Sequence, residues 1–145
     1  MLKLEARYVD EMVAHAREDD PNESCGILAG KDGQVVRLYR MTNVAQSPYR
    51  YSMDPREVFR VTWEIEGHGW EFFAIYHSHT HTEAYPSATD VRMATWLEPD
   101  GTKLSVWPGT YYTLVSLQDQ ERPVVRAFRI IDGAITEEEL HVIQE

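Results

Sequence analysis

Two histidines, His77 and His79, stand one residue apart directly after the apolar run 72–76, and Asp90 follows a short polar stretch later. Residues two apart on a β-strand point to the same side, so both imidazoles can face one point. Two imidazoles and one carboxylate suit a catalytic zinc ion, which keeps a fourth position open for water. The pair also ends an apolar strand, where α/β sheets tend to place ligands. This spacing predicts a metal site.

The aspartate has a second interpretation. Ser87-x-x-Asp90 is the pattern of a helix capping box, in which the serine side chain and the acid each bond to the other's backbone amide. From these two residues alone, capping is the favoured interpretation. Both roles can hold together, because Ser87 can cap the helix while the Asp90 carboxylate turns to a metal.

Two further residues carry ligand chemistry. His81 would face the same metal if the strand continued, and with Asp90 it would close the coordination sphere into a structural site. We instead expect residues 80–83 to leave the strand as a loop on the substrate side. Cys25 could be a thiolate ligand or a nucleophile, but it lies in an apolar run, where a free cysteine behaves as a small hydrophobic residue. The remaining histidines, His15, His68 and His141, are scattered, and we expect them to be ordinary.

Composition narrows the class of protein. The chain has 145 residues, of which 43% are hydrophobic and 26% charged, which is typical of one globular domain. A formal net charge of −10 disfavours binding to nucleic acid or to an anionic membrane. No run approaches the roughly 18 apolar residues that span a bilayer. The single cysteine excludes an internal disulfide and fits a reducing compartment, so we expect a cytoplasmic protein, with homodimer formation left open.

The pattern of apolar residues predicts the elements that must position these side chains. Helical spacing indicates helices, and alternating or continuous apolar runs indicate strands. The expected helices cover residues 8–19, 55–67 and 86–96, and the expected strands cover residues 25–29, 35–41, 71–79, 111–117 and 124–131. We expect an extended piece at 49–53, a loop at 97–109 and a weaker final segment at 134–143. This order predicts an α/β (α+β) fold, one domain over residues 1–145 with a mixed β-sheet flanked by helices.

The motif as a whole resembles a known family. His77-Ser78-His79, seven further residues and then Ser87-x-x-Asp90 match the signature of the JAMM (MPN+) zinc metalloproteases. Five positions at fixed spacing are far more specific than a lone pair of histidines. The resemblance, which covers nearly the whole chain, implies that His77, His79 and Asp90 bind Zn²⁺ and that the Ser87 hydroxyl helps to stabilise the oxyanion.

The same resemblance nominates a general base. The family carries a glutamate upstream of the histidines, beside a small apolar strand, and residues 21–30 are similar to that segment. The resemblance therefore assigns to Glu23 the transfer of a proton from water to the leaving amine. The chain has many glutamates, and spacing alone does not choose among them.

Three segments, at 43–48, 51–55 and 76–91, are similar to the bacterial Mec-type hydrolases of this family. That resemblance implies a substrate: a ubiquitin-like sulfur-carrier protein that ends in Gly-Gly and carries cysteine on its terminal glycine. Hydrolysis of the amide bond would release cysteine, as a step of cysteine biosynthesis. A narrow channel that admits only glycine would make the enzyme selective for that tail.

The chain also departs from related patterns. Thr80 stands where deubiquitinating members carry proline, no counterpart of their ubiquitin-gripping insertions is evident, and the 97–109 loop looks long. An alternative is therefore an isopeptidase on other ubiquitin-like conjugates. A non-catalytic scaffold is disfavoured, because scaffold members typically lack the ligand set that is present here. The ligand types also accept iron or manganese, although zinc is expected.

Overall fold

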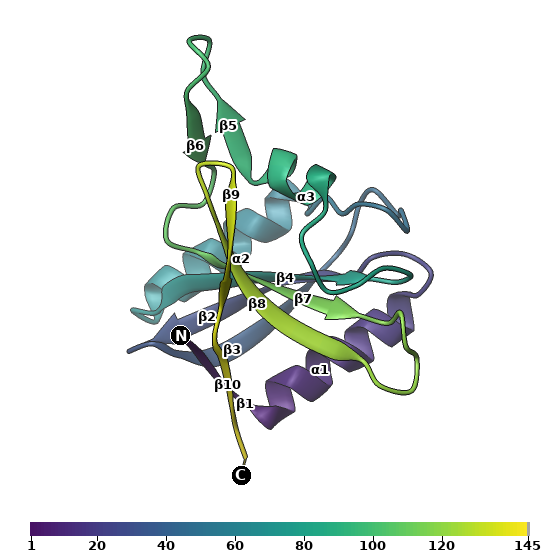
Figure 1. Ribbon diagram of the computed structural model, residues 1–145. Coiled ribbons are helices and arrows are strands. Elements are labelled where there is room, and N and C mark those ends of the chain that lie inside the picture. Colours follow the sequence, from purple (N-terminus) through teal and green to yellow (C-terminus); the bar gives the residue numbers. More distant parts are fainter. Residues whose placement is uncertain (145) are drawn as a thin grey trace.

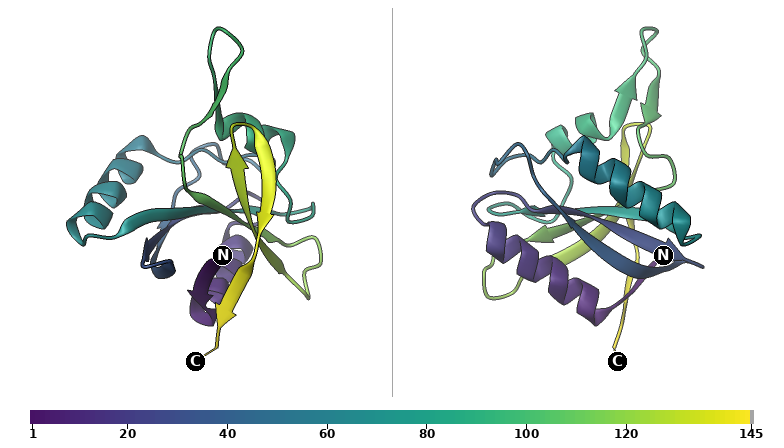
Figure 2. Two further views of the ribbon diagram at one scale, coloured as in Figure 1. Left: turned by 60° about the vertical axis from the view of Figure 1, so that its left-hand side comes forward. Right: turned by 180° about the vertical axis from the view of Figure 1, so that it is seen from behind.

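One mixed sheet organises the chain, of which the computed structural model describes residues 1–144 (Figure 1). Its eight strands are, in order across the sheet, β10 (Leu140–Ile143), β1 (Leu2–Glu5), β3 (Gln34–Met41), β2 (Cys25–Lys31), β4 (Glu71–His79), β7 (Tyr111–Ser116), β8 (Val124–Ile131) and β9 (Ala134–Glu138). Helices α1 (Ala6–Asp19) and α2 (Pro55–Gly67) lie on opposite faces of the sheet (Figure 2). The predicted mixed α+β fold is therefore confirmed.

Each long helix buries one apolar stripe against its own face of the sheet. On α1 the stripe comprises Tyr8, Met12 and Ala16, which pack into one core cluster. Helix α2 begins as the sequence predicts, because the Asp54 side chain accepts a hydrogen bond from the Arg56 amide and proline occupies the first helical turn. Among the described residues, none of the helices combines the length and apolar character that crossing a membrane requires.

Strand β4 is the central strand that carries the chemistry. It pairs antiparallel with β2 and parallel with β7, and both of its faces are covered from Phe73 onwards. Such double coverage explains why its sequence is a continuous apolar run. The strand's last residues are His77, Ser78 and His79, so the histidines reach the end of the sheet already buried.

The two ends of the sheet meet through the last stretch of chain. Strand β9 pairs with β8 at one end of the strand order, and β10 pairs with β1 at the other end. Only Glu139 separates β9 from β10, and its carbonyl accepts a hydrogen bond of 2.9 Å from the Leu2 amide. The sheet must therefore curl, and both views in Figure 2 show this continuous C-terminal strand running along its side.

Several sequence-based boundaries were wrong. The final segment is two strands, and the four-residue strand β1 was missed because so short a run carries no periodic signal. The third helix, α3 (Ala88–Met93), ends before the expected residue 96. Strand β5 (Thr95–Leu97) follows it and pairs with β6 (Lys103–Ser105), so the expected 97–109 loop contains a projecting hairpin (Figure 1). The 49–53 piece forms only an isolated bridge between Met53 and Asn43.

Candidate metal centre

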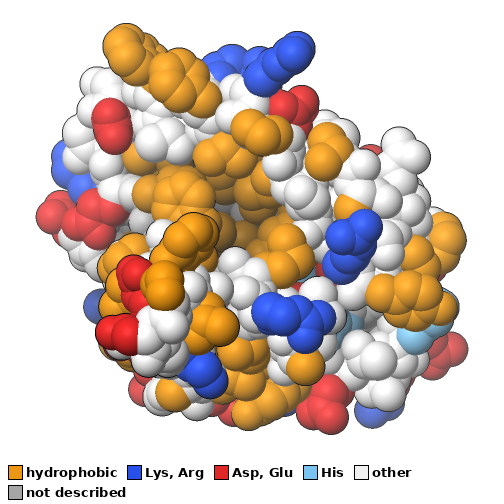
Figure 3. All heavy atoms as spheres, turned by 90° about the horizontal axis from the view of Figure 1, so that it is seen from above, with side chains coloured by type: hydrophobic (Ala, Val, Ile, Leu, Met, Phe, Trp, Pro, Cys, Tyr) orange, Lys and Arg blue, Asp and Glu red, His pale blue; other side chains and the backbone are white. Residues whose placement is uncertain are grey.

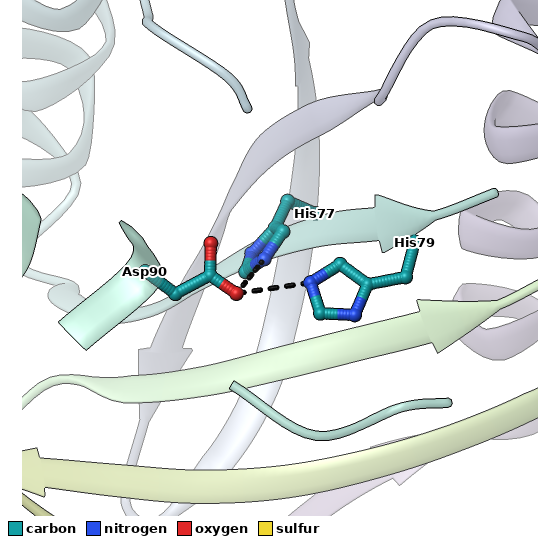
Figure 4. Close-up of side chains that lie close together, drawn as sticks. All are labelled: His77, His79 and Asp90. Atoms are coloured by element: carbon teal, nitrogen blue, oxygen red, sulfur yellow. Dashed lines mark hydrogen bonds and ion pairs between the residues drawn. The ribbon is translucent and has the colours of Figure 1, made fainter. Parts of the chain in front are cut away.

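The structure brings His77, His79 and Asp90 together, as their spacing predicts (Figure 4). The histidines extend from the end of β4 and the aspartate from the first turn of α3. One carboxylate oxygen, Asp90 Oδ2, lies 2.9 Å from His79 Nε2 and 3.1 Å from His77 Nε2. All three side chains are buried. Three potential ligand atoms of N, N, O type thus converge on one point.

Ser87-x-x-Asp90 forms the capping box, and the geometry leaves the metal interpretation of Asp90 open. The Ser87 Oγ accepts a hydrogen bond of 3.0 Å from the Asp90 amide, and Asp90 Oδ2 accepts one of 2.9 Å from the Ser87 amide. That same oxygen faces the two imidazoles. Within residues 1–144 the Ser87 hydroxyl accepts a hydrogen bond but donates none, so its proton is available to a ligand.

The carboxylate is held in its charged form. Burial opposes the ionisation of Asp90, but the positive charge of His77 and the hydrogen bonds from His79 and the Ser87 amide outweigh it. Together they hold the pKa of Asp90 well below its usual range. An ionised carboxylate beside two imidazoles is the state that a divalent cation requires of its ligands.

The ring of His79 is oriented by the backbone. Its Nδ1 lies 2.8 Å from the carbonyl oxygen of Glu83, which can only accept, so Nδ1 carries the proton and Nε2 faces Asp90. Burial opposes a charge on this ring, but the bonds to Asp90 and to the Glu83 carbonyl outweigh it and raise the pKa of His79. A bond from the distal ring nitrogen to a carbonyl is the usual support of a metal-bound histidine.

The ring of His77 is held differently. Within the described chain neither of its buried nitrogens has a hydrogen-bond partner, since the 3.1 Å approach to Asp90 Oδ2 lacks hydrogen-bond geometry. The Tyr51 ring stacks on it instead, at 4.5 Å between centroids and 27° between planes. A buried imidazole without a hydrogen-bond partner is costly unless a ligand binds it. Ligand atoms of a tetrahedral zinc site lie about 3.3 Å apart, close to the spacing found here. The residues therefore fit a bound metal ion.

Glu23 lies beside this cluster because β2 and β4 are paired. The Ser78 amide donates to the Ser24 carbonyl at 3.1 Å, and the Ser24 amide donates to Ser78 Oγ at 2.8 Å. The residue before Ser24 therefore lies next to the residue after Ser78, which is His79. Directly paired residues share one face of a sheet, so Glu23 and His79 project to the same side.

The Glu23 carboxyl is poised to gain or lose a proton near neutral pH. Its side chain is only 3% exposed, and its Oε1 has no hydrogen-bond partner among residues 1–144. Burial raises the pKa of Glu23 to about 8, with a smaller lowering by the charge of His79 and a smaller raising by that of Asp90. A cation at the adjacent ligands would favour the carboxylate form, as a general base requires.

The family follows from sequence comparison. The family model for prokaryotic homologs of the JAB domain matches residues 5–131. The chain belongs to this family. A CysO-cysteine peptidase of Mycobacterium tuberculosis is 44% identical over 147 residues, covering 100% of this chain and 93% of that protein. A desampylase of Haloferax volcanii is 34% identical over 131 residues, covering 80% of this chain and 94% of that protein.

Solved structures agree with this JAB assignment. The solution structure of a Desulfitobacterium hafniense protein has a TM-score of 0.84 at 37% identity, covering 100% of this chain and 94% of the other. A JAMM protein described as a metalloprotease-like zinc site in the proteasome and signalosome has a TM-score of 0.55 at 16% identity, covering 99% and 98%, which is likeness of fold alone. The predicted JAMM relationship is confirmed, and the chain is a hydrolase of this type.

Two other candidate residues of this JAB domain lie outside the centre. His81 is exposed, and the only group of potential ligands found in the described part of the chain is His77, His79 and Asp90. A closed site with a third histidine is thus not formed. Cys25 is fully buried, and burial raises the pKa of its thiol to about 12, so it is neither a thiolate ligand nor a nucleophile.

Sequence reasoning missed three supports of the centre. The Glu83 carbonyl is a backbone acceptor, which no residue type reveals. The hydroxyl of Ser78 ties β4 to the start of β2, and only the strand register makes that visible. Tyr51 stacks on His77 from a segment far away in sequence, although its position inside the family-like segment 51–55 was a signal.

Proposed function

We propose that this JAMM hydrolase cleaves the amide bond between the C-terminal glycine of a ubiquitin-like sulfur-carrier protein and cysteine, releasing cysteine in the cytoplasm. The proposal is carried by one observation: a buried His77–His79–Asp90 ligand set with an acid beside it, in a chain 44% identical along its whole length to a CysO-cysteine peptidase.

Each residue has one task in the reaction. His77, His79 and Asp90 hold a divalent cation, for which zinc is the natural choice given nitrogen and oxygen ligands. A bound zinc ion supplies Lewis acidity, which makes water a nucleophile near neutral pH. Glu23 accepts the proton of the attacking water and returns it to the cysteine nitrogen as the carbon–nitrogen bond breaks. The products are the carrier with a free C-terminal carboxylate and cysteine with a free amine.

Ser87 stabilises the oxyanion that forms when water adds to the glycine carbonyl carbon. Its hydroxyl proton has no acceptor among residues 1–144, and its Oγ is fixed by the bond from the Asp90 amide. A donor held in place before the reaction stabilises developing charge without reorganising. The carrier tail would end in Gly-Gly, and a passage too narrow for a side chain would explain the choice of glycine.

The second candidate is an isopeptidase that acts on ubiquitin-like conjugates. It is favoured by relatives named for that activity, namely the Haloferax desampylase and a probable TtuB-protein conjugate cleaving protease of Thermus thermophilus, which is 35% identical over 92 residues. Both candidates use the same centre, so they differ only in the group that leaves.

Mass spectrometry of two substrates separates these candidates. We expect the zinc-loaded protein to release cysteine from a carrier–cysteine adduct, with a chelator abolishing the release and Glu23→Gln retaining metal but losing turnover. A lysine-linked conjugate should be cut far more slowly. Efficient cleavage of the lysine conjugate alone would overturn the assignment to cysteine, and full turnover by the Glu23→Gln variant would place the base elsewhere.

A further inference from the structure

A groove lies next to the candidate metal centre. It is a cavity of about 500 Å³ between helix α2, strands β4 and β7 and the segment after β6. Its lining includes Tyr51, Val58, Phe59, Phe72, Ile75 and Trp107. Two of its lining rings, those of Phe72 and Trp107, stack at 4.6 Å between centroids. Seen from above, the molecule has a hollow surrounded by hydrophobic side chains (Figure 3).

The apolar surface continues outwards from the groove. Phe59, at the groove, and Trp63, one turn further along α2, are 70% and 71% exposed, and their rings stack at 6.3 Å. Met93 of α3 also lines the groove and is exposed, and further large apolar side chains are exposed on the β5–β6 hairpin: Trp96, Leu97 and Leu104. Large exposed apolar side chains gathered beside an apolar groove are typical of a protein interaction site. Two stacked aromatic rings on one helix are suitable anchors for a partner.

Unpaired arginines accompany these aromatic side chains. Arg60 shares a shallow pocket with Phe59 and Trp63, and Arg56 lies one turn earlier on the same helix. Within residues 1–144 neither arginine forms an ion pair, although the chain carries a net charge of −10. Figure 3 shows Lys and Arg side chains at the margin of the hollow. Free cations beside apolar surface fit a partner that presents carboxylates around an apolar patch. A second copy of this acidic chain would instead be repelled.

The groove is also connected to the chemistry. Tyr51 forms part of the groove wall and stacks on the ring of His77. A partner seated in the groove therefore touches the side chain that packs on a metal ligand. A protein whose tail enters the centre would place its folded body on this side of the molecule.

We infer that this groove, together with the Phe59–Trp63 face of α2, binds the folded body of the sulfur carrier through an apolar patch flanked by acidic side chains. The inference rests on the proposed function for the identity of the carrier. The interaction is distinct from the capture of the Gly-Gly tail, because its anchors Phe59 and Trp63 lie on α2 and only the groove wall at Tyr51 adjoins the metal centre. Docking of the body should therefore affect affinity and leave the chemical step unchanged.

Titration calorimetry with the cysteine-free carrier tests this inference without depending on catalysis. We expect the double variant Phe59→Ser/Trp63→Ser to raise the Kd at least tenfold, and Arg60→Glu to raise it in a manner that high salt reduces. Val124→Ser is the matched control, because Val124 is 47% exposed on β8, and it should bind as the wild type does. A short Gly-Gly-Cys peptide should be hydrolysed at the wild-type rate by all of these variants.

Each other outcome counts against the inference. An unchanged Kd in the double variant, or a wild-type protein that does not bind the carrier, removes the docking site even if the peptide is cleaved. Equal loss of peptide hydrolysis would mean that the substitutions disturb the centre. A wild-type dimer in sedimentation experiments that the double variant dissociates would assign the face to a second copy of the chain. If the carrier binds through α2 but its cysteine adduct is not cleaved, the proposed function fails and the docking site stands.

Discussion

Two buried histidines on opposite sides of β4 have opposite surroundings. His15, on α1, forms a hydrogen bond within the protein: its Nδ1 lies 2.6 Å from the Tyr76 hydroxyl. Each ring also has one nitrogen near a carboxylate, His15 Nε2 at 3.3 Å from Asp19 and His77 Nε2 at 3.1 Å from Asp90. His77 is as deeply buried, yet neither of its nitrogens has a hydrogen-bond partner in the described chain. We infer that the hydrogen-bonded histidine supports the fold, whereas the one without a hydrogen bond is available to a ligand.

The pKa values of two buried histidines, His15 and His79, differ in the same way between the two sites. Burial lowers the pKa of His15 below its usual value, although the charge of Asp19 opposes this, so the ring is kept neutral. At the other site the bonds to Asp90 outweigh burial and raise the pKa of His79. The surroundings of His15 disfavour a charged ring, whereas His79 lies against the charged carboxylate of Asp90.

Removal of the unsatisfied histidine should have the largest effect. We expect His77→Ala to lose the metal and to reduce kcat/KM by about 10³-fold or more, because several kcal/mol of charge stabilisation disappear with the ion. Metal content by inductively coupled plasma mass spectrometry and cleavage kinetics check this. A variant that keeps both its zinc and its rate would show that this imidazole is not a ligand.

Loss of the Ser87 hydroxyl should leave the metal in place. Removal of one oxyanion donor typically costs about 3–4 kcal/mol, so Ser87→Ala should lower kcat on the order of 10²-fold or more while zinc stays bound. The helix cap is also lost, which costs about 1 kcal/mol of stability. Kinetics measured well below the melting temperature separate the two effects, and an unchanged kcat contradicts the catalytic role.

The stability of the metal-free protein should depend on Glu23. Because burial raises its pKa from 4.5 to about 8, the folded state holds this proton more tightly than the unfolded state. That stabilisation is complete below pH 4.5 and is lost as pH rises to about 8. The isosteric Glu23→Gln variant should therefore gain stability over the wild type across this range, by on the order of 4 kcal/mol at pH 8. Chemical denaturation at several pH values measures the gap, and a gap that does not change with pH would refute the shift.

The satisfied histidine should matter for stability alone. His15→Phe leaves the buried Tyr76 hydroxyl without its partner, which costs about 1–3 kcal/mol. Because this ring lies behind β4, away from Asp90, zinc content and kcat should stay at wild-type values. A large loss of activity in a folded His15→Phe protein would break the contrast between the two sites.

The sequence predicted those features that depend on residues close together along the chain. The pairing of His77 with His79 was predicted because a strand has a fixed periodicity, and Asp54-Pro55 located the start of α2 because helix starts have a local signature. Spacing alone favoured Asp90 as a helix cap, and the family resemblance added its role as a ligand. Glu23 came only from family resemblance, since its position beside His79 depends on how β2 pairs with β4.

The features that were missed depend on contacts between distant parts of the chain. Strands β1 and β10 are each four residues long and are held by each other, so neither shows a pattern alone. The β5–β6 hairpin begins inside the expected helix 86–96 and continues into the expected loop 97–109, and it was missed because its strands are only three residues each. Tyr51 is an ordinary tyrosine until the fold brings it against His77.

Titration of the metal-free protein with Zn²⁺ tests the central claim most directly. We expect one ion bound per chain, with two imidazole nitrogens and one carboxylate oxygen as protein ligands by X-ray absorption, and no such binding in the His77→Ala variant. A wild-type protein that takes up no zinc, or that binds it equally well without the His77 imidazole, would contradict the account.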